Sequence, residues 1–352
     1  MMNRYEVRRD IRATACRVHR LLSHAGTCGV LLAAMTASAA RANDTTAALT
    51  TGGLVFGKNA NIEMRSEDLS ISEKQIVVHY RFFNRAKSDE TVTVAFPMPD
   101  VDWTDAHPIA VPNNESDNFL DFHTTVDGRP VAMQIEQKAF VEGRDVTQPL
   151  VALGVPLMPT AKKTHAVLDA LPKAASQKLL AQKIVRPDDY DAGKGMEHHI
   201  APLWSVRTTY YWRQTFPAGR EMTVEHRYRP SVGGSVQTRI GSDYTTPAEM
   251  RDYATRYCTD KGFLSGAAGL KRKNKGVPAP ELKLAYVLTT GANWAGPIGD
   301  FRLTIDKGTP DSLISFCEDG AVKKIGPTTF EVRHRNFAPT RDLDILILRA
   351  YR

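Results

Sequence analysis

The sequence of 352 residues has only four cysteines, no long apolar run after its first 42 residues and none of the common catalytic motifs. The patterns Gly-x-Ser-x-Gly, Ser-x-x-Lys and His-Glu-x-x-His are all absent, so the usual signatures of serine hydrolases and zinc proteases are missing. Gly193-Lys194-Gly195 lacks the spacing and the following Ser or Thr of a phosphate-binding loop. The sequence therefore predicts no catalytic residue and no cofactor.

Residues 1–42 have the organisation of a secretory signal peptide. Six arginines precede an apolar run of 12 residues at positions 29–40, and Ala40-Arg41-Ala42 supplies a small-x-small cleavage pattern. Twelve residues span about 18 Å as a helix against the roughly 30 Å of a bilayer core, so no permanent membrane anchor is expected. We expect cleavage after Ala42 and a mature chain that begins at Asn43, in the periplasm or outside the cell.

Most of the excess positive charge belongs to that leader. The whole chain has 46 basic and 39 acidic residues, and positions 1–42 hold seven basic and two acidic ones, which leaves 39 and 37 for the remainder. A net charge of +2 over the remainder gives no basis for a nucleic-acid partner.

Two cysteines, Cys258 and Cys317, follow the leader. In an oxidising compartment such an isolated pair usually forms a disulfide, which for a loop of this length stabilises the fold by about 4 kcal/mol in the chain-entropy account. The alternative is a nucleophilic thiol, but no Cys-x-x-Cys or companion motif accompanies either residue. We expect a structural bridge that joins a helix to a strand.

Alternation of apolar and polar residues is the dominant pattern after the leader. Residues 75–83 alternate, and residues 92–96 repeat the pattern after a polar turn, which predicts a hairpin with one buried face. The longest alternating segment, residues 203–216, is expected to pair in the same way with residues 222–228.

A further hairpin is predicted for residues 119–126 and 131–136, because Asp127-Gly128 suits the positive φ angles of a tight turn. Additional strands are expected at residues 282–288, 301–305, 313–317, 330–334 and 343–348. Apolar residues recur at helical spacing between 147 and 185, which predicts an insertion of two or three helices, and a short helix is expected at 247–258.

Many short antiparallel strands with turns between them favour layered sheets. We predict a mainly β chain of two β-sandwich-like lobes, residues 43–145 and 200–352, with a helical insertion and linker at 146–199. The two halves resemble each other weakly, because each has an aromatic strand, a charged turn and a Val-containing strand that ends at proline.

Several segments together resemble a known family of secreted bacterial proteins. They are NDTTAALTTGGLVF at the mature start, IEMRSEDLSISEKQIVVHYRFFN, VTVAFPMPD, YYWRQTFPAG, VEHRYRPSVGG and the C-terminal GPIGDFRLTIDKG. The chain is similar over nearly its whole mature length to the family catalogued as domain of unknown function 4424. The resemblance implies an exported envelope protein and assigns no functional residues.

Two groups of polar residues are candidates for a metal site. His198-His199 would need a turn and further ligands such as His226 or His79, and a polar linker is the plainer interpretation. A carboxylate-rich loop could hold a hard cation or paired acids, although solvated loop charges explain it as well; its members are Asp100, Asp102, Asp105, Glu115, Asp117 and Asp121. We predict no metal ligand.

Trp103 and Trp294 lie in polar, turn-rich surroundings, unlike the two tryptophans on the strand at 203–216. Exposed tryptophans on loops can stack on a sugar or enter a partner's pocket, so these two residues are the candidate ligand-binding positions. The alternative is that each caps one end of its own sandwich. The predicted role is non-catalytic: a binding or structural protein of the bacterial envelope whose partner is a protein or glycan. The alternative is a carboxylate- or metal-dependent hydrolase of envelope polymers.

Overall fold

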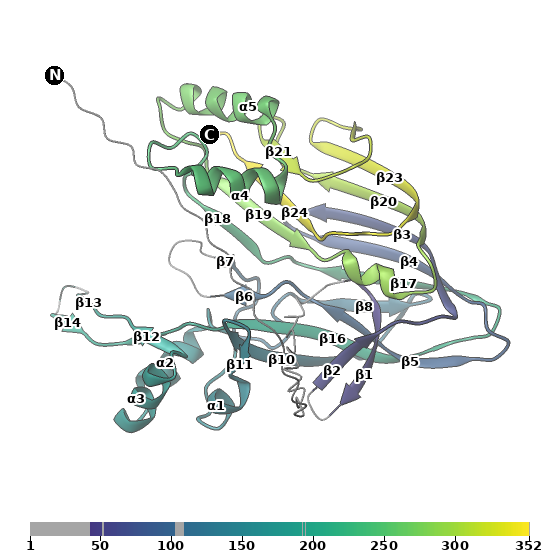
Figure 1. Ribbon diagram of the computed structural model, residues 1–352, viewed down its shortest axis with the longest axis horizontal. Helices are drawn as coiled ribbons and strands as arrows, with labels where there is room; N and C mark the ends of the chain where they lie inside the picture. Colours follow the sequence, from purple (N-terminus) through teal and green to yellow (C-terminus); the bar gives the residue numbers. More distant parts are fainter. Residues whose placement is uncertain (1–42, 51–52, 103–108, 192, 194, 352) are drawn as a thin grey trace, which may run out of the picture. The chain divides into compact units, whose positions relative to one another are not determined.

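The computed structural model describes residues 43–50, 53–102, 109–191, 193 and 195–351 (Figure 1). Most of the described strands lie in three sheets, named A, B and C below, and strand residues clearly outnumber helix residues, so the prediction of a mainly β chain is confirmed. No helix in the described ranges has the length and apolar character needed to cross a membrane.

Each sheet draws its strands from distant parts of the chain. In spatial order, sheet A contains β11 (Arg144–Asp145), β10 (Gln134–Val141), β16 (Ser205–Phe216), β5 (Glu90–Pro97), β1 (Thr45–Thr50) and β2 (Gly53–Gly57), with β6 (Val101–Asp102) also paired to β16. Sheet B contains β22 (Lys323–Lys324), β23 (Thr329–Phe337), β20 (Ile298–Asp306), β3 (Ile62–Ser72), β4 (Ile76–Asn84), β17 (Glu221–Tyr228), β8 (His123–Val126) and β9 (Arg129–Pro130). Sheet C contains β21 (Leu313–Phe316), β24 (Leu343–Leu348), β19 (Glu281–Tyr286), β18 (Val232–Ser235) and β7 (Ile109–Ala110).

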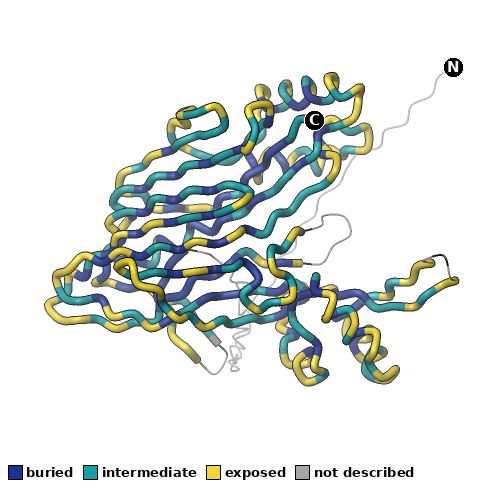
Figure 2. Tube along the Cα trace, turned by 180° about the vertical axis from the view of Figure 1, so that it is seen from behind, coloured by how far each residue is buried: buried dark blue, intermediate teal, exposed yellow. Residues whose placement is uncertain are grey.

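Sheets A and C pack against the same face of sheet B. Phe82 on β4 contacts Phe216 of sheet A with ring centroids 5.8 Å apart, and Tyr80 on the same strand meets Tyr286 of sheet C with hydroxyl oxygens 3.0 Å apart. One apolar core therefore joins all three sheets. In Figure 2 the buried segments follow the strands, and the connecting loops are mostly exposed.

The two predicted hairpins are wrong in their pairing, although their strands are correct. β4 and β17 are neighbours in sheet B, whereas β5 and β16 are neighbours in sheet A. Both short connections therefore cross from one sheet to the other. The apolar face of each strand looks into the shared core from either sheet, so the alternation cannot distinguish a hairpin from a crossover. The weak internal resemblance corresponds to these two crossovers, which lie together where the Asn84 side chain donates to the carbonyl of Phe216 at 2.8 Å.

The predicted boundaries at residues 145 and 200 do not separate two lobes. β16 lies between β10 and β5, and β17 lies between β4 and β8, so both main sheets combine strands from before and after the insertion. The described residues, from Asn43 to Tyr351, all belong to one compact unit. Layered sheets of mostly antiparallel strands are present, as predicted, but each main sheet combines strands from both halves of the sequence.

The turn at Asp127-Gly128 has the predicted positive φ angles, 47° and 74°. It joins β8 to the very short β9, however, and the next strand, β10, leaves for sheet A. The predicted pairing of residues 119–126 with 131–136 is therefore wrong beyond the first residues after the turn, because Tyr210 and its neighbours on β16 offer β10 a longer partner.

The helical insertion is confirmed. It holds α1 (Thr147–Val151), α2 (Lys162–Asp169) and α3 (Lys173–Ala181), followed by the paired strands β12 (Val185–Pro187) with β15 (Ile200–Pro202) and β13 (Tyr190–Asp191) with β14 (Met196–Glu197). The apolar faces of the helices surround Trp204, whose indole nitrogen donates to the carbonyl of Leu157 at 2.8 Å.

Two helices cover the face of sheet C that points away from sheet B. α4 (Pro247–Tyr257) begins with a capping box between Thr246 and Glu249, as expected for a strong helix start. α5 (Lys261–Lys273), which the sequence did not predict, follows directly, and residues of both helices share one apolar cluster with the buried Leu346 and Leu348 of β24 (Figure 1). A short 3-10 helix, η1 (Thr289–Asn293), follows β19.

Candidate functional site

A cleft of about 1100 Å³ opens at the edge of sheet C. Its residues come from the β3–β4 turn, from β7 and β18, from the start of β19 and from the C-terminal segment. The lining is mainly apolar and includes Ile109, Val111, Pro112, Pro230, Val232, Val236, Pro280 and Leu282. Pockets of this kind, with apolar walls and a few polar groups, are the usual sites for small ligands.

The shape of the cleft follows from two short strands. β7 pairs with β18 only at Val232 and Gly233, so beyond that point Gly234 and Ser235 have no strand partner on this side among the described residues. A Cβ atom at Gly234 would collide with the carbonyl oxygen of Glu281 on the adjacent strand. Glycine at this position therefore allows the two backbones to approach and keeps the floor of the cleft open.

The cleft is lined by three cations, Lys74, Arg229 and Arg349, and by two carboxylates, Glu73 and Glu281. Arg349 forms an ion pair with Glu73, and Arg229 forms one with Asp121 at 3.2 Å. Lys74 is exposed and has no ion pair with any residue that the structure describes. An anionic group entering the cleft would therefore find an ammonium group ready to bind it.

A second, more polar cavity of about 620 Å³ adjoins the cleft and shares Ile109, Gly233 and Gly234 with it. Arg256 forms an ion pair with Asp344 in its wall at 2.9 Å. Burial raises the pKa of Tyr257 well above its usual value, so its hydroxyl stays protonated, and within the described residues this hydroxyl has no hydrogen-bond partner. The two cavities are adjoining candidate sites, one mainly apolar and one more polar.

The predicted carboxylate loop does not converge on a site. Asp100 and Asp102 line the polar cavity, but Asp100 is held by the guanidinium of Arg207 in two contacts of 3.2 and 3.1 Å. Asp121 pairs with Arg229, and Glu115 accepts from the backbone nitrogen of Lys162 at 2.8 Å. Asp117 lines a separate cavity beside the helical insertion, and Asp105 lies outside the described residues. No three His, Cys, Asp or Glu side chains in the described part of the chain are placed to hold a metal ion.

The histidines are also separated. His198 and His199 contact different carboxylates, Asp189 at 3.1 Å and Asp169 at 3.0 Å, in the linker before β15. Hydrogen bonds to Asp169 and Glu197 raise the pKa of His199. His79 pairs on the surface with Glu225 at 3.4 Å, whereas His226 is fully buried, as the core interpretation predicts.

The prediction that Trp294 is an exposed binding residue is wrong as to its exposure. Its side chain is 3% exposed and packs against Phe82, with ring centroids 4.7 Å apart, and its indole nitrogen donates to the carbonyl of Asp44 at 2.6 Å. The polar turn around it, η1, covers the end of the core while the ring points inward. Trp103 lies outside the described residues.

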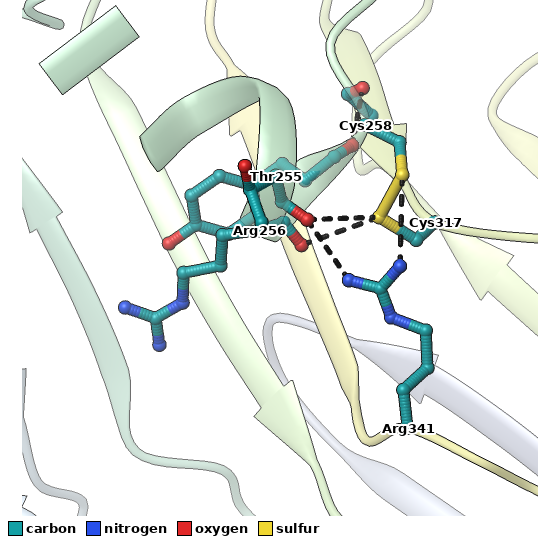
Figure 3. The surroundings of a disulfide bond; sticks show 7 residues. Thr255, Arg256, Cys258, Cys317 and Arg341 are labelled. Atoms are coloured by element: carbon teal, nitrogen blue, oxygen red, sulfur yellow. Dashed lines mark hydrogen bonds between the residues drawn. A yellow bond between two sulfur atoms is a disulfide. The ribbon is translucent and has the colours of Figure 1, made fainter. Parts of the chain in front are cut away.

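The disulfide between Cys258 and Cys317 is present, with Cα atoms 4.9 Å apart. It joins the end of α4 to the residue after β21, so a helix end is tied to a strand end as expected (Figure 3). The guanidinium of Arg341 lies against this bridge and donates to the carbonyl of Thr255 at 3.0 Å.

A buried polar cluster lies at the junction of the three sheets, and the sequence did not predict it. Its members are Asn43, Asp44, Glu67, Tyr80, Thr124, His226 and Tyr286, each 3% exposed or less. His226 forms hydrogen bonds of 2.9 Å with Asp44 on one side and Thr124 on the other. The Asn43 side chain donates to Glu67 at 3.1 Å, and burial raises the pKa of Glu67 to about 8.

Sequence reasoning missed the cleft residues because they come from five separate segments. One signal was available: two adjacent glycines, Gly233 and Gly234, interrupt a segment that otherwise alternates, and such glycines often mark a close backbone approach. Nothing local distinguishes Lys74 or Arg349 from other surface cations.

These features define a mainly β protein of three interleaved sheets with an open cleft at one sheet edge. The chain belongs to the family described as domain of unknown function (DUF4424), whose model matches residues 42–346, so the resemblance noted from the sequence is confirmed.

Among solved structures, the chain is similar to a crystal structure from Legionella pneumophila described as a candidate nutrient binding protein. The two share 15% sequence identity with a TM-score of 0.41, and the match covers 88% of this chain and 71% of the other. The comparison with curated proteins finds no match.

Proposed function

We propose that this is an exported, non-catalytic binding protein that takes up a small ligand in the cleft at the edge of sheet C. The observation that carries the proposal is the cleft itself: about 1100 Å³, with mainly apolar walls and cationic groups at the rim. This combination favours a ligand with an apolar body and an anionic group.

Two observations support export to the periplasm or beyond. The Cys258–Cys317 bridge is typical of an oxidising compartment. The family match begins at residue 42, where the predicted leader ends. The concave cleft favours a small ligand over the predicted envelope protein or glycan, because a folded partner needs a broad complementary surface.

The binding test uses 1-anilinonaphthalene-8-sulfonate, which combines apolar rings with a sulfonate and fluoresces when it enters an apolar pocket. Val232→Trp fills the cleft and should weaken binding of this probe at least tenfold, because the added indole occupies the space of the rings. Lys74→Glu should weaken it about three- to tenfold, and more strongly at low salt, because it replaces attraction by repulsion.

The matched control is Ile325→Trp, which adds the same indole at a position that is 53% exposed and lies outside the cleft. Thermal unfolding should confirm that all three variants remain folded. Equal probe affinities in the parent, the two cleft variants and the control would contradict the proposed site.

A further inference from the structure

The buried polar cluster is built around the two residues that follow the expected cleavage site. Asn43 and Asp44 are both fully buried. The carbonyl of Asn43 accepts from Thr290 at 2.7 Å, and its side chain contacts Glu67 and Tyr80. A new amino terminus without a structural role would lie on the surface, whereas Asn43 and Asp44 are fixed inside the core.

The cluster has two carboxylates and lacks a permanent cation. Among the described residues, Glu67 accepts hydrogen bonds from two neutral groups, the Asn43 amide at 3.1 Å and the Tyr286 hydroxyl at 3.4 Å. Asp44 uses one carboxylate oxygen for His226, and its other oxygen is buried without a partner among the described residues. No lysine or arginine in the described chain forms an ion pair with Asp44 or Glu67, and the ion-pair partner of Asp44 is His226. Buried carboxylates normally have a charged or hydrogen-bonding partner for each oxygen, so one partner is missing here.

We propose that this cluster is an internal binding site for an α-ammonium group, and that its ligand is the new amino terminus of Asn43. Hydrolysis of the Ala42–Asn43 peptide bond adds one water molecule, which leaves a carboxylate on Ala42 and an amine on Asn43 that takes up a proton. The inference rests on the proposed cleavage after Ala42, and it concerns what the new terminus does afterwards.

Covalent geometry keeps this group close to the cluster. The α-nitrogen of Asn43 is within about 5 Å of its own side-chain amide nitrogen, because only a few covalent bonds separate them. That amide nitrogen lies 3.1 Å from Glu67, and the unpartnered oxygen belongs to Asp44, the next residue along the chain. An ammonium group at this position supplies three donors and a positive charge to a region that has acceptors in excess.

The site also predicts a change in pH dependence on maturation. While the nitrogen of residue 43 is an uncharged amide, the raised pKa of Glu67 means that the folded state binds a proton more tightly than the unfolded state does. The stability that Glu67 contributes is then fully present below about pH 4.5 and is lost as the pH rises to about 8. With the ammonium group in place the ionised carboxylate is stabilised, and this loss should largely disappear.

The experiment compares two exported chains: one that begins at Asn43, with its terminus verified by mass spectrometry, and one that keeps a single extra alanine, Ala42. Thermal unfolding is followed from pH 5 to 8. We expect the chain that begins at Asn43 to unfold at a temperature several degrees higher at pH 7 and to change less with pH. In Glu67→Gln versions of both chains the difference should shrink by at least half.

The matched control is Glu63→Gln on the same strand, which is partly exposed and should leave the difference unchanged. The folded chain that begins at Asn43 should also react with acetic anhydride at its α-amino group at least 100-fold more slowly than the unfolded chain does. Identical unfolding curves for the two termini, or a freely reactive amine in the folded protein, would overturn the proposed ammonium site. Neither result would affect probe binding in the cleft, so the two proposals fail separately.

Discussion

The buried polar cluster and the edge cleft both combine polar groups with apolar surroundings, but their relation to water is opposite. In the cluster, His226 and its partners are nearly inaccessible, whereas Lys74 and Val236 at the cleft are exposed. Buried polar groups must satisfy one another, so the cluster fixes how the three sheets meet. Exposed polar groups retain capacity for a ligand. The comparison suggests that the cluster carries stability and the cleft carries binding.

The largest effect should come from Trp294→Ala at the edge of the cluster. Removing this ring leaves a cavity beside Phe82 and Phe216 and deletes the hydrogen bond to the carbonyl of Asp44, so we expect a loss of about 3–5 kcal/mol in the free energy of unfolding, measured with urea. Tyr244→Ala, at a position that is 82% exposed, is the control and should change stability by about 0.5 kcal/mol or less. A small loss at Trp294 would show that this end of the core is not closed.

A smaller loss, about 2–4 kcal/mol, is expected for His226→Phe. The aromatic ring still packs among Phe96, Phe122 and Trp212, but the partners of both ring nitrogens, Asp44 and Thr124, are left buried and unsatisfied. The same replacement at His79, which lies on the surface, should cost less than about 0.5 kcal/mol. Equal urea midpoints for the two variants would remove the distinction between the cluster and the surface.

The smallest stability effect belongs to the cleft. Arg349→Ala breaks an ion pair with Glu73 in which both side chains remain partly exposed, so it should change the free energy of unfolding by about 1 kcal/mol or less. Binding of the anilinonaphthalene sulfonate should nevertheless weaken two- to fivefold, because a cation at the rim is lost. A large stability loss without any change in probe affinity would reverse the roles assigned to the two regions.

Alternation along the chain predicted most strands correctly, because burial of every second side chain is a local property. The partners of those strands were predicted wrongly where the choice was between sheets, since Phe82 on β4 and Phe96 on β5 face the same core from opposite sides. α5 was missed because Gly266 and Gly269 lower the helix propensity of a segment whose Phe263, Ala267 and Leu270 have helical spacing.

The sites were harder to predict than the strands. Cys258 and Cys317 could be paired because they are the only cysteines after the leader. Trp294 points inward at the residue where the chain leaves η1, whereas the polar residues around it in the sequence indicated an exposed loop. The cleft depends on the contact of segments that are far apart in sequence, which local patterns do not report.

The interleaved order of the strands has a consequence for how the chain acquires its structure. β3, at residues Ile62–Ser72, has β20, at Ile298–Asp306, as its parallel neighbour, so an inner part of sheet B is completed only when nearly the whole polypeptide is available. Such a high contact order makes folding slow and keeps early segments without their partners. If the chain is exported as proposed and emerges amino end first, β3 would lack this neighbour for most of the passage, and sheet B would be completed only once the last strands arrive.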